Sequence, residues 1–166
     1  MPEQETQPRL AGYLDKQQPD LYATLSHYSQ QLVEEADRLG ISRRTLELIN
    51  YRCSQINGCA FCLDLHHRRA LKYGETEQRL SLVAVYKEVQ LFEPAEVVAM
   101  EIAEQITRMS SSRPSPELFD QARQHYSDEQ ISVLCMAAIG INAFNRLSIL
   151  SEHPVRAAKK QAPPQP

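Results

Sequence analysis

Two cysteines separated by two residues form the part of the sequence best suited to chemistry. Cys59 and Cys62 follow the turn signal Asn57-Gly58 and open a stretch with the apolar spacing of a helix. A helix N-terminus carries roughly half a positive charge, which favours the thiolate form of a nearby cysteine. The thiolate is the reactive form, and thiols at this spacing can form a disulfide. The pair therefore suits peroxide reduction or thiol–disulfide exchange.

A histidine and a glutamate accompany the cysteine pair. His66 follows Cys62 by four residues, so the two side chains are neighbours on one face of a helix. An adjacent imidazole can accept the thiol proton or stabilise the thiolate. Glu47 lies in the preceding predicted helix, and it can approach the cysteine end or His66 if the two helices pack as an antiparallel pair. A carboxylate beside a histidine fixes the tautomer of the ring and raises its basicity.

Zinc binding is an alternative use of the same region. Cys53, Cys59, Cys62 and His66 offer four possible ligands. Cys53 falls on an apolar stripe, however, and the sequence has no second C-x-x-C, so redox chemistry is favoured over zinc. A thioredoxin-type domain would need strands around the motif, and none is predicted there. The sequence indicates no partner for three other histidines, His27, His125 and His153.

The elements that position these residues are predicted to be helices alone. The stretch between Pro19 and Pro94 contains no proline and is rich in residues that favour helix. No alternating run of β-branched residues bounded by turns predicts a strand. The predicted helices cover about 21–39, 43–55, 59–73, 76–89, 94–109, 116–126 and 128–151. The last helix is apolar almost all round, so we expect it at the centre of the fold or at a subunit interface.

The expected organisation is one helical domain between two flexible ends. The 166 residues suffice for a single buried core, and 42% of them are apolar. We expect a flexible N-terminal segment over 1–17, the domain over 18–152 and a disordered tail over 153–166. The net charge of −3, without blocks of one sign, argues against a nucleic-acid partner. No apolar run long enough for a membrane span and no signal-peptide segment were identified, which predicts a cytoplasmic protein.

The motif region resembles a known family. The pattern Glu-x11-Cys-x2-Cys-x3-His, from Glu47 to His66, is similar to the alkylhydroperoxidase D-like branch of the carboxymuconolactone decarboxylase family. Further similarity lies in Leu63-Asp64-x-His66, in Ala70-x-x-Tyr73-Gly74 and in Asn142-Ala143-Phe144-Asn145-Arg146. The resemblance extends in layout over roughly residues 20–150.

This resemblance implies a thiol-dependent peroxidase with antioxidant, peroxiredoxin-type activity. It implies an all-α bundle of about six to seven helices that forms a homo-oligomer through its helices, as a dimer, trimer or hexamer. Cys62 would attack the hydroperoxide, Cys59 would resolve the intermediate into a redox disulfide, and Glu47 and His66 would form the proton relay. The implied electron donor is a dithiol or a lipoylated protein, and no metal or organic cofactor is required.

One position departs from the family pattern, and two other functions stay open. Some active members carry a histidine between the two cysteines, where this sequence has Phe61, so a relay through that histidine is absent. The other branch of the family carries out lactone decarboxylation or isomerisation, which does not need the cysteine pair. The third hypothesis is a redox-sensing helical protein without catalytic activity.

Overall fold

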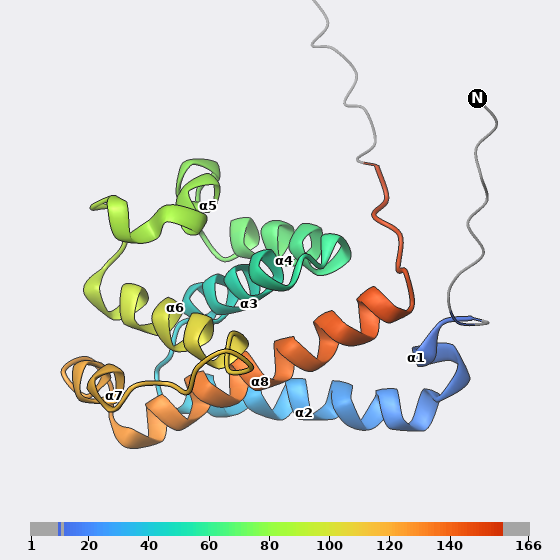
Figure 1. Cartoon of the computed structure of the whole chain (residues 1–166), viewed down its shortest axis with the longest axis horizontal. Helices are drawn as coiled ribbons and strands as arrows, with labels where there is room; N and C mark the ends of the chain where they lie inside the picture. The colour runs from blue at the N-terminus through green and yellow to red at the C-terminus, as the bar shows by residue number, and fades with distance from the viewer. Residues whose placement is uncertain (1–9, 11, 158–166) are drawn as a thin grey trace, which may run out of the picture.

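The structure, a computed structural model, describes residues 10 and 12–157 and is entirely helical over that part of the chain (Figure 1). These residues form eight α-helices and one 3-10 helix without a strand, so the predicted all-α fold is confirmed. In chain order the elements are α1 (Leu14–Gln17), α2 (Pro19–Arg38), α3 (Arg43–Asn57), α4 (Ala60–Lys72), α5 (Glu77–Leu82), η1 (Val83–Glu88), α6 (Pro94–Thr107), α7 (Pro116–Ala122) and α8 (Asp128–Leu150).

Local sequence signals explain where the helices around the cysteine motif begin and end. The side-chain hydroxyl of Ser42 accepts a hydrogen bond from the backbone N–H of Thr45 at 3.0 Å and so caps α3. After α3, Gly58 has a φ of 69°, a left-handed conformation that glycine adopts without a side-chain penalty. This turn reverses the chain and places Cys59 at the entrance to α4.

Several helices differ from the sequence predictions: α1 was not predicted, and α7 ends at Ala122 rather than at about residue 126. The helix predicted over 76–89 is divided into α5 and η1, and Val85 within η1 has the non-helical angles φ −125° and ψ 28°. The β-branched residues Val83 and Val85 lose side-chain freedom in a helix, which weakens the continuous helix that the pattern suggested. α2 begins at Pro19 rather than after Asp20, because proline is well suited to the first helical position.

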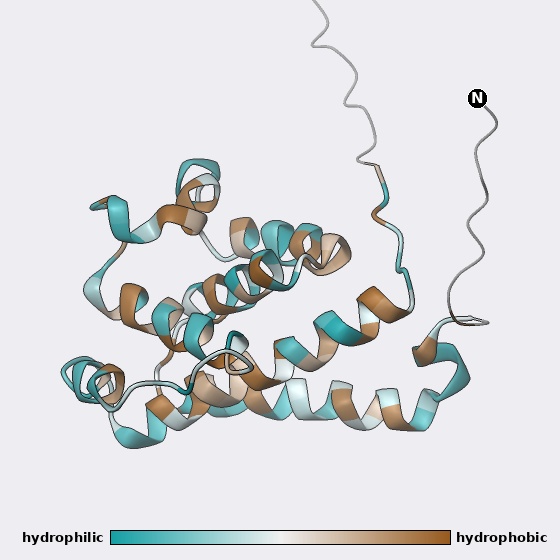
Figure 2. Ribbon diagram, viewed as in Figure 1, coloured by the Kyte–Doolittle hydropathy of each residue, from teal (hydrophilic) through white to brown (hydrophobic). Residues whose placement is uncertain are grey.

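Two clusters of buried apolar side chains pack against α3 on both sides. Figure 2 shows hydrophobic and hydrophilic residues interspersed along the helices of the bundle. The larger cluster lies between α2, α3, α6 and α8 and includes Ile49, Ile102 and Leu134. The smaller cluster joins α3 to α4, α5, η1 and α6 and includes Leu48. Because the adjacent residues Leu48 and Ile49 belong to different clusters, the helix that carries Glu47 has a fixed position and rotation.

Helix α8 is the longest element and packs against α2, α3 and α6. It has the length and apolar composition of a membrane span, which the sequence analysis did not identify. Its contacts with three helices make it a core helix of the bundle, in agreement with its nearly uniform apolar character. Ile139 and Leu150 on α8 stay exposed, and oligomerisation through helices stays a prediction.

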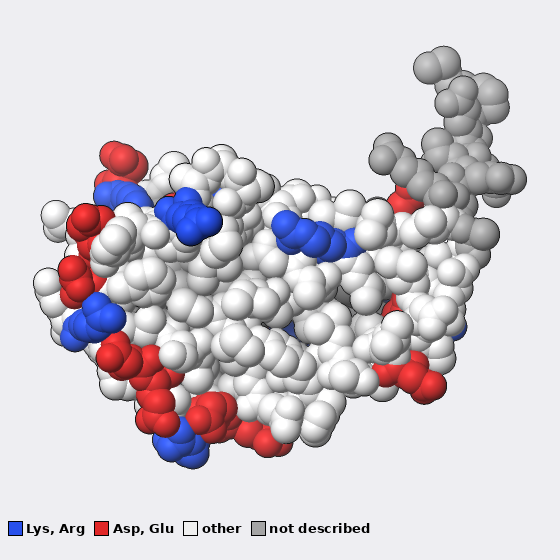
Figure 3. Space-filling model, turned by 60° about the horizontal axis from the view of Figure 1, so that its bottom comes forward, with Lys and Arg blue, Asp and Glu red and all other residues white. Residues whose placement is uncertain are grey.

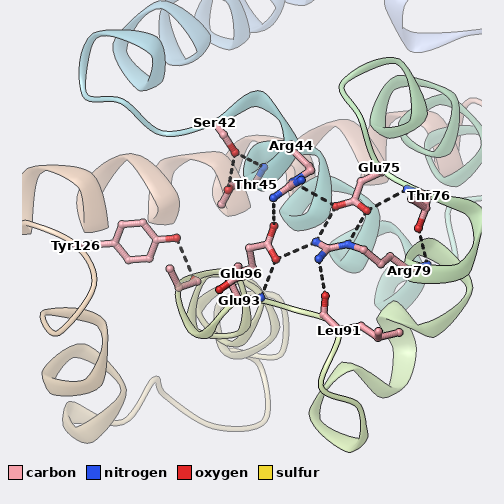
Figure 4. Close-up of polar contacts among 11 residues, drawn as sticks. Ser42, Arg44, Thr45, Glu75, Thr76, Arg79, Leu91, Glu93, Glu96 and Tyr126 are labelled. Atoms are coloured by element: carbon pink, nitrogen blue, oxygen red, sulfur yellow. Dashed lines mark hydrogen bonds and ion pairs between the residues drawn. The ribbon is translucent and has the colours of Figure 1, made fainter.

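A cluster of charged side chains ties α3, α6 and the turn after α4 together (Figure 4). Arg79 donates hydrogen bonds to Glu75 at 2.8 and 2.9 Å and to Glu96 at 2.8 Å. Arg44 on α3 lies 3.2 Å from the carboxylate of Glu96 and 3.7 Å from that of Glu75. Both carboxylates are buried, so each depends on the two arginines for compensation of its charge.

The two ends of the described chain meet beside α8 (Figure 1). The backbone N–H of Leu14 donates a hydrogen bond to the hydroxyl of Ser151 at 3.0 Å. The segments predicted to be flexible, 1–17 and 153–166, fall mostly outside the described residues, and the boundaries at 18 and 152 stay predictions.

On the face shown in Figure 3, charged side chains gather toward one end and the centre is mostly uncharged.

Candidate active site

Cys59 and Cys62 lie together at the N-terminus of α4 as two free thiols. Cys59 is the residue that caps the helix, and its sulfur accepts a hydrogen bond from the backbone N–H of Cys62 at 3.3 Å. Only 2% of Cys59 and 3% of Cys62 is exposed. A sulfur atom thus occupies the position that a serine or aspartate oxygen usually takes, where the helix N-terminus stabilises negative charge.

The two thiols differ strongly in acidity. The pKa of Cys62 is lowered to about 6, chiefly by a hydrogen bond from Cys59 and against the opposing effect of burial. Hydrogen bonds from Ser148 and Asn145 and the charge of His66 contribute in the same direction. The pKa of Cys59 is raised, because its proton is held in the hydrogen bond to Cys62 and because it is buried. At neutral pH the pair therefore favours one thiolate, on Cys62, and one thiol, on Cys59.

Glu47 and His66 form a buried pair between α3 and α4. Oε2 of Glu47 lies 2.6 Å from Nδ1 of His66, and both residues are buried. The antiparallel packing of α3 and α4 brings them together, which is one of the two arrangements expected for an antiparallel helix pair. With the carboxylate accepting a hydrogen bond from Nδ1–H, the other ring nitrogen, Nε2, is left to exchange a proton with a ligand.

A cavity of about 920 Å³ opens onto this pair and onto one of the two cysteines. Its lining includes Cys62, His66 and Glu47 together with the apolar surfaces of Phe61 and Phe144. Cys59 is absent from the lining of this cavity. A small molecule in the cavity would therefore meet the more acidic sulfur first.

Two residues from α8 complete the surroundings of the sulfurs, and the sequence analysis did not assign either a role. Asn145 is completely buried, accepts a hydrogen bond from Asn57 at 2.8 Å and donates one to Ser54 at 3.0 Å. It thereby fixes the end of α3 just before the cysteine turn. Ser148 lines the same cavity as Cys62, and its hydroxyl acts to lower the pKa of both cysteine thiols. Asn145 fell in a segment quoted for the family resemblance, whereas Ser148 lies 86 positions after Cys62 in no motif.

Cys53 is separate from this site. Its sulfur contacts the backbone carbonyl of Ala103 at 3.8 Å and accepts a hydrogen bond from Thr107 at 3.1 Å, both on α6. Burial raises its pKa to about 12, which keeps it a thiol. Over residues 10 and 12–157, no three or more His, Cys, Asp or Glu side chains are grouped to hold a metal ion. The zinc alternative of the sequence analysis thus lacks a ligand set in this region.

The fold and the site have counterparts among known proteins. Residues 19–105 match the model of the carboxymuconolactone decarboxylase family. This match runs from the start of α2 to the penultimate turn of α6 and includes all four residues of the predicted motif. The chain belongs to the carboxymuconolactone decarboxylase family, and its resemblance is to the alkylhydroperoxidase D-like branch.

Two individual proteins illustrate the similarity. The uncharacterized protein YdfG of Bacillus subtilis is 44% identical over 120 residues, which cover 72% of this chain and 80% of YdfG. A crystal structure from Agrobacterium tumefaciens superimposes with a TM-score of 0.80 at 27% identity, covering 90% of this chain and all of the other. That protein is described as one of unknown function and, provisionally, as the antioxidant defence protein AhpD.

Proposed function

We propose that this protein is a thiol-dependent peroxidase that reduces hydroperoxides through a Cys59–Cys62 disulfide. The observation that carries the proposal is the asymmetry of the cysteine pair. Cys62 lines the cavity and has the lowered pKa, whereas Cys59 lies outside the cavity lining and has the raised pKa. A peroxidase of this type needs one thiolate that attacks the substrate and a second thiol nearby that converts the resulting sulfenic acid into a disulfide.

In the first step, the Cys62 thiolate attacks the terminal oxygen of a hydroperoxide. The O–O bond breaks, its electron pair leaves with the alkoxide, and Cys62 becomes a sulfenic acid. His66, which has held the proton from Cys62, supplies a proton so that the alkoxide leaves as an alcohol. Glu47 stabilises the protonated ring, because its carboxylate lies 2.6 Å from Nδ1. The sulfur is oxidised by two electrons and the peroxide is reduced by two.

In the second step, the Cys59 thiol attacks the sulfur of the sulfenic acid. An S–S bond forms, the S–O bond breaks, and the hydroxyl leaves with a proton as water. A dithiol, either a small molecule or a lipoylated protein, then reduces the disulfide by exchange through a mixed disulfide and is itself oxidised. No metal or organic cofactor enters this cycle. We also propose that the protein works as a homo-oligomer.

The test separates the two cysteines. Cys62→Ser should abolish peroxide consumption with a dithiol donor, and no sulfenic acid should be trapped by dimedone. Cys59→Ser should also lose turnover, but peroxide should still oxidise Cys62, and dimedone should label it at one site per chain. Cys135→Ser, which changes a cysteine outside the site, is the matched control and should keep the wild-type rate. Turnover that survives in Cys62→Ser would refute the proposal.

The same variants distinguish the other two hypotheses. Lactone decarboxylation or isomerisation would persist when both Cys59 and Cys62 are replaced by serine. A redox sensor would lose two accessible thiols on peroxide treatment and recover them with a dithiol, but it would show no continuous peroxide consumption. Thiol titration before and after peroxide, together with a steady-state peroxide assay, therefore separates all three functions.

A further inference from the structure

The turn between α3 and α4 decides how far apart the two sulfurs of the cysteine pair lie. Cys62 is in the regular part of α4, whereas Cys59 precedes the helix with extended backbone angles, φ −84° and ψ 96°. The residue before it, Gly58, has a φ of 69° and no Cβ, so it is the most pliable residue of the turn. A disulfide needs its two Cβ atoms about 3.5–4.5 Å apart. Helical geometry alone therefore does not set this separation, and the conformation of the turn does.

Asn57, the last residue of α3, is held by two side chains of α8. Its Nδ2 atom donates one hydrogen bond to Oδ1 of Asn142 at 2.9 Å and another to Oδ1 of Asn145 at 2.8 Å. Asn142 and Asn145 are three residues apart, so they are neighbours on one face of α8. Both amide hydrogens of Asn57 are thus used, and the residue just before the pliable glycine is fixed to the longest helix of the bundle.

The same face of α8 also holds the turn through Ser54. Nδ2 of Asn145 donates a hydrogen bond to the Ser54 hydroxyl at 3.0 Å, and the backbone carbonyl of Ser54 accepts one from the backbone N–H of Cys59 at 3.1 Å. Ser54 and Asn145 are both completely buried, so water does not compete for the hydrogen bond between them. α8 reaches the second cysteine as well, because the sulfur of Cys62 lies 3.9 Å from the carbonyl oxygen of Phe144.

Backbone carbonyls fix the direction of these hydrogen bonds. Nδ2 of Asn142 donates to the carbonyl of Ala138 at 2.8 Å, and the Ser54 hydroxyl donates to the carbonyl of Asn50 at 2.7 Å. A reversed Asn142 amide would place two carbonyl oxygens against each other, so the amide is held with its oxygen toward Asn57. Asn57 therefore meets acceptors in fixed positions rather than amides that can turn over.

We propose that Asn57, Asn142 and Asn145 are positioning residues that hold the cysteine turn in the conformation from which the Cys59–Cys62 disulfide forms. This asparagine clamp thereby shifts the thiol–disulfide equilibrium toward the disulfide. Asn57 bonds to α8 rather than to either sulfur, so it acts only through the turn. The inference rests on the disulfide of the proposed function, but it does not require that a peroxide be the oxidant.

The equilibrium depends on the turn because only one of the two redox forms needs a fixed geometry. The dithiol tolerates a range of separations between its sulfur atoms, whereas the disulfide does not. Without the clamp, the turn gains conformational freedom in the dithiol form, and that freedom is lost again when the S–S bond closes. Removal of the clamp should therefore disfavour the disulfide.

The test is the equilibrium between the dithiol and the disulfide in glutathione buffers of defined composition. The exchange is balanced, since the disulfide and two molecules of reduced glutathione give the dithiol and one molecule of oxidised glutathione. After acid quenching and alkylation, mass spectrometry of the peptide that contains both cysteines gives the two populations. Asn57→Ala should lower the equilibrium constant for disulfide formation by about 3- to 10-fold, the net contribution of about one hydrogen bond. Asn142→Ala removes one of the two acceptors and should lower the constant by a smaller factor.

Tyr126→Phe is the matched control. The Tyr126 hydroxyl donates a hydrogen bond to the Ala95 carbonyl at 2.9 Å in the first turn of α6, whereas α6 reaches the clamp at its last residue, Thr107, which accepts a hydrogen bond from Asn142 at 2.9 Å. Loss of the Tyr126 bond should weaken the dithiol and disulfide forms equally, so the equilibrium constant should stay at the wild-type value. The sign of the shift separates the clamp from an effect on thiol acidity, because a hydrogen bond lost from a thiolate would destabilise the dithiol and favour the disulfide.

An unchanged or raised equilibrium constant in Asn57→Ala would overturn the proposal, and so would an unchanged constant in Asn142→Ala if the first variant does not fold. A wild-type protein that forms no Cys59–Cys62 disulfide would overturn it together with the proposed function. A lowered constant in a protein that consumes no peroxide would support the clamp and contradict the peroxidase function. Peroxide turnover with an unshifted constant would refute the clamp alone.

Discussion

Removing the sulfur of Cys59 should make the thiol of Cys62 a weaker acid. In the structure the hydrogen bond from Cys59 is the largest cause of the low pKa of Cys62, and burial opposes it. The variant Cys59→Ala deletes this donor but leaves the remaining hydrogen bonds from α8 in place. The pKa of Cys62 should therefore move from about 6 toward that of an ordinary cysteine.

The size of the shift follows from the strength of one charge-assisted hydrogen bond. Such a bond contributes roughly 1.5–3 kcal/mol, and one pKa unit corresponds to about 1.4 kcal/mol, so the expected rise is about one to two units. At about pH 6.5, roughly three-quarters of the wild-type Cys62 would be thiolate. The variant would hold between roughly a quarter and a few per cent, so its alkylation rate at this pH should fall by about 3- to 25-fold.

The assay is the rate of iodoacetamide modification of Cys62 between about pH 5 and 9, the range that brackets the two expected midpoints. Cys59→Ser keeps a hydroxyl donor at the same position and should show a smaller shift, while Cys135→Ala should show none. A Cys59→Ala midpoint within about half a unit of wild type would contradict the reasoning. A wild-type midpoint near the ordinary value of about 8.5 would contradict it more directly.

Two predictions concern stability and are measured by urea unfolding at neutral pH. Glu96→Ala should destabilise the fold by about 3–5 kcal/mol, since it leaves Arg44 and Arg79 short of a buried counter-charge. The control is Glu101→Ala on the same helix, which breaks an exposed ion pair with Lys87 and should destabilise the fold by at most about 1 kcal/mol. Equal losses would show that burial of the cluster does not matter. Gly58→Ala should lower the free energy of unfolding by about 1–2 kcal/mol, because Gly58 has a positive φ that alanine adopts poorly. Gly58→Asn should lower it less, since asparagine tolerates the left-handed conformation better. Equal losses for the two variants would mean that the left-handed turn does not restrict this position.

The helical fold was readable from the sequence because its signals are local. Apolar spacing, the Ser42 cap and the glycine after α3 act within a few residues, so the helix boundaries around the motif follow from short segments. The division into α5 and η1 was missed, because apolar spacing does not register how strongly the β-branched residues Val83 and Val85 disfavour a continuous helix. The short helix α1 was missed for a related reason. Its four residues carry little periodicity, and it contacts α2 and α8.

In the candidate site, too, some contacts follow from the sequence and others only from the packing of the helices. Cys59, Cys62 and His66 share one helix, so their proximity follows from the helical repeat. Glu47 reaches His66 only because α3 and α4 pack antiparallel, which the sequence allowed without requiring. Ser148 comes from the far end of the chain, and no spacing rule connects it to the cysteines.

The sequence by itself determined that the chain is helical, that a C-x-x-C pair opens a helix and that a histidine lies one turn further along, because these features depend on neighbours in the chain. Tertiary structure decided which cysteine faces the cavity, which one gives up its proton more readily and which residues of α8 support it. Those properties depend on burial and on hydrogen bonds between segments more than eighty residues apart, and such distances in the chain become short only when the bundle has packed.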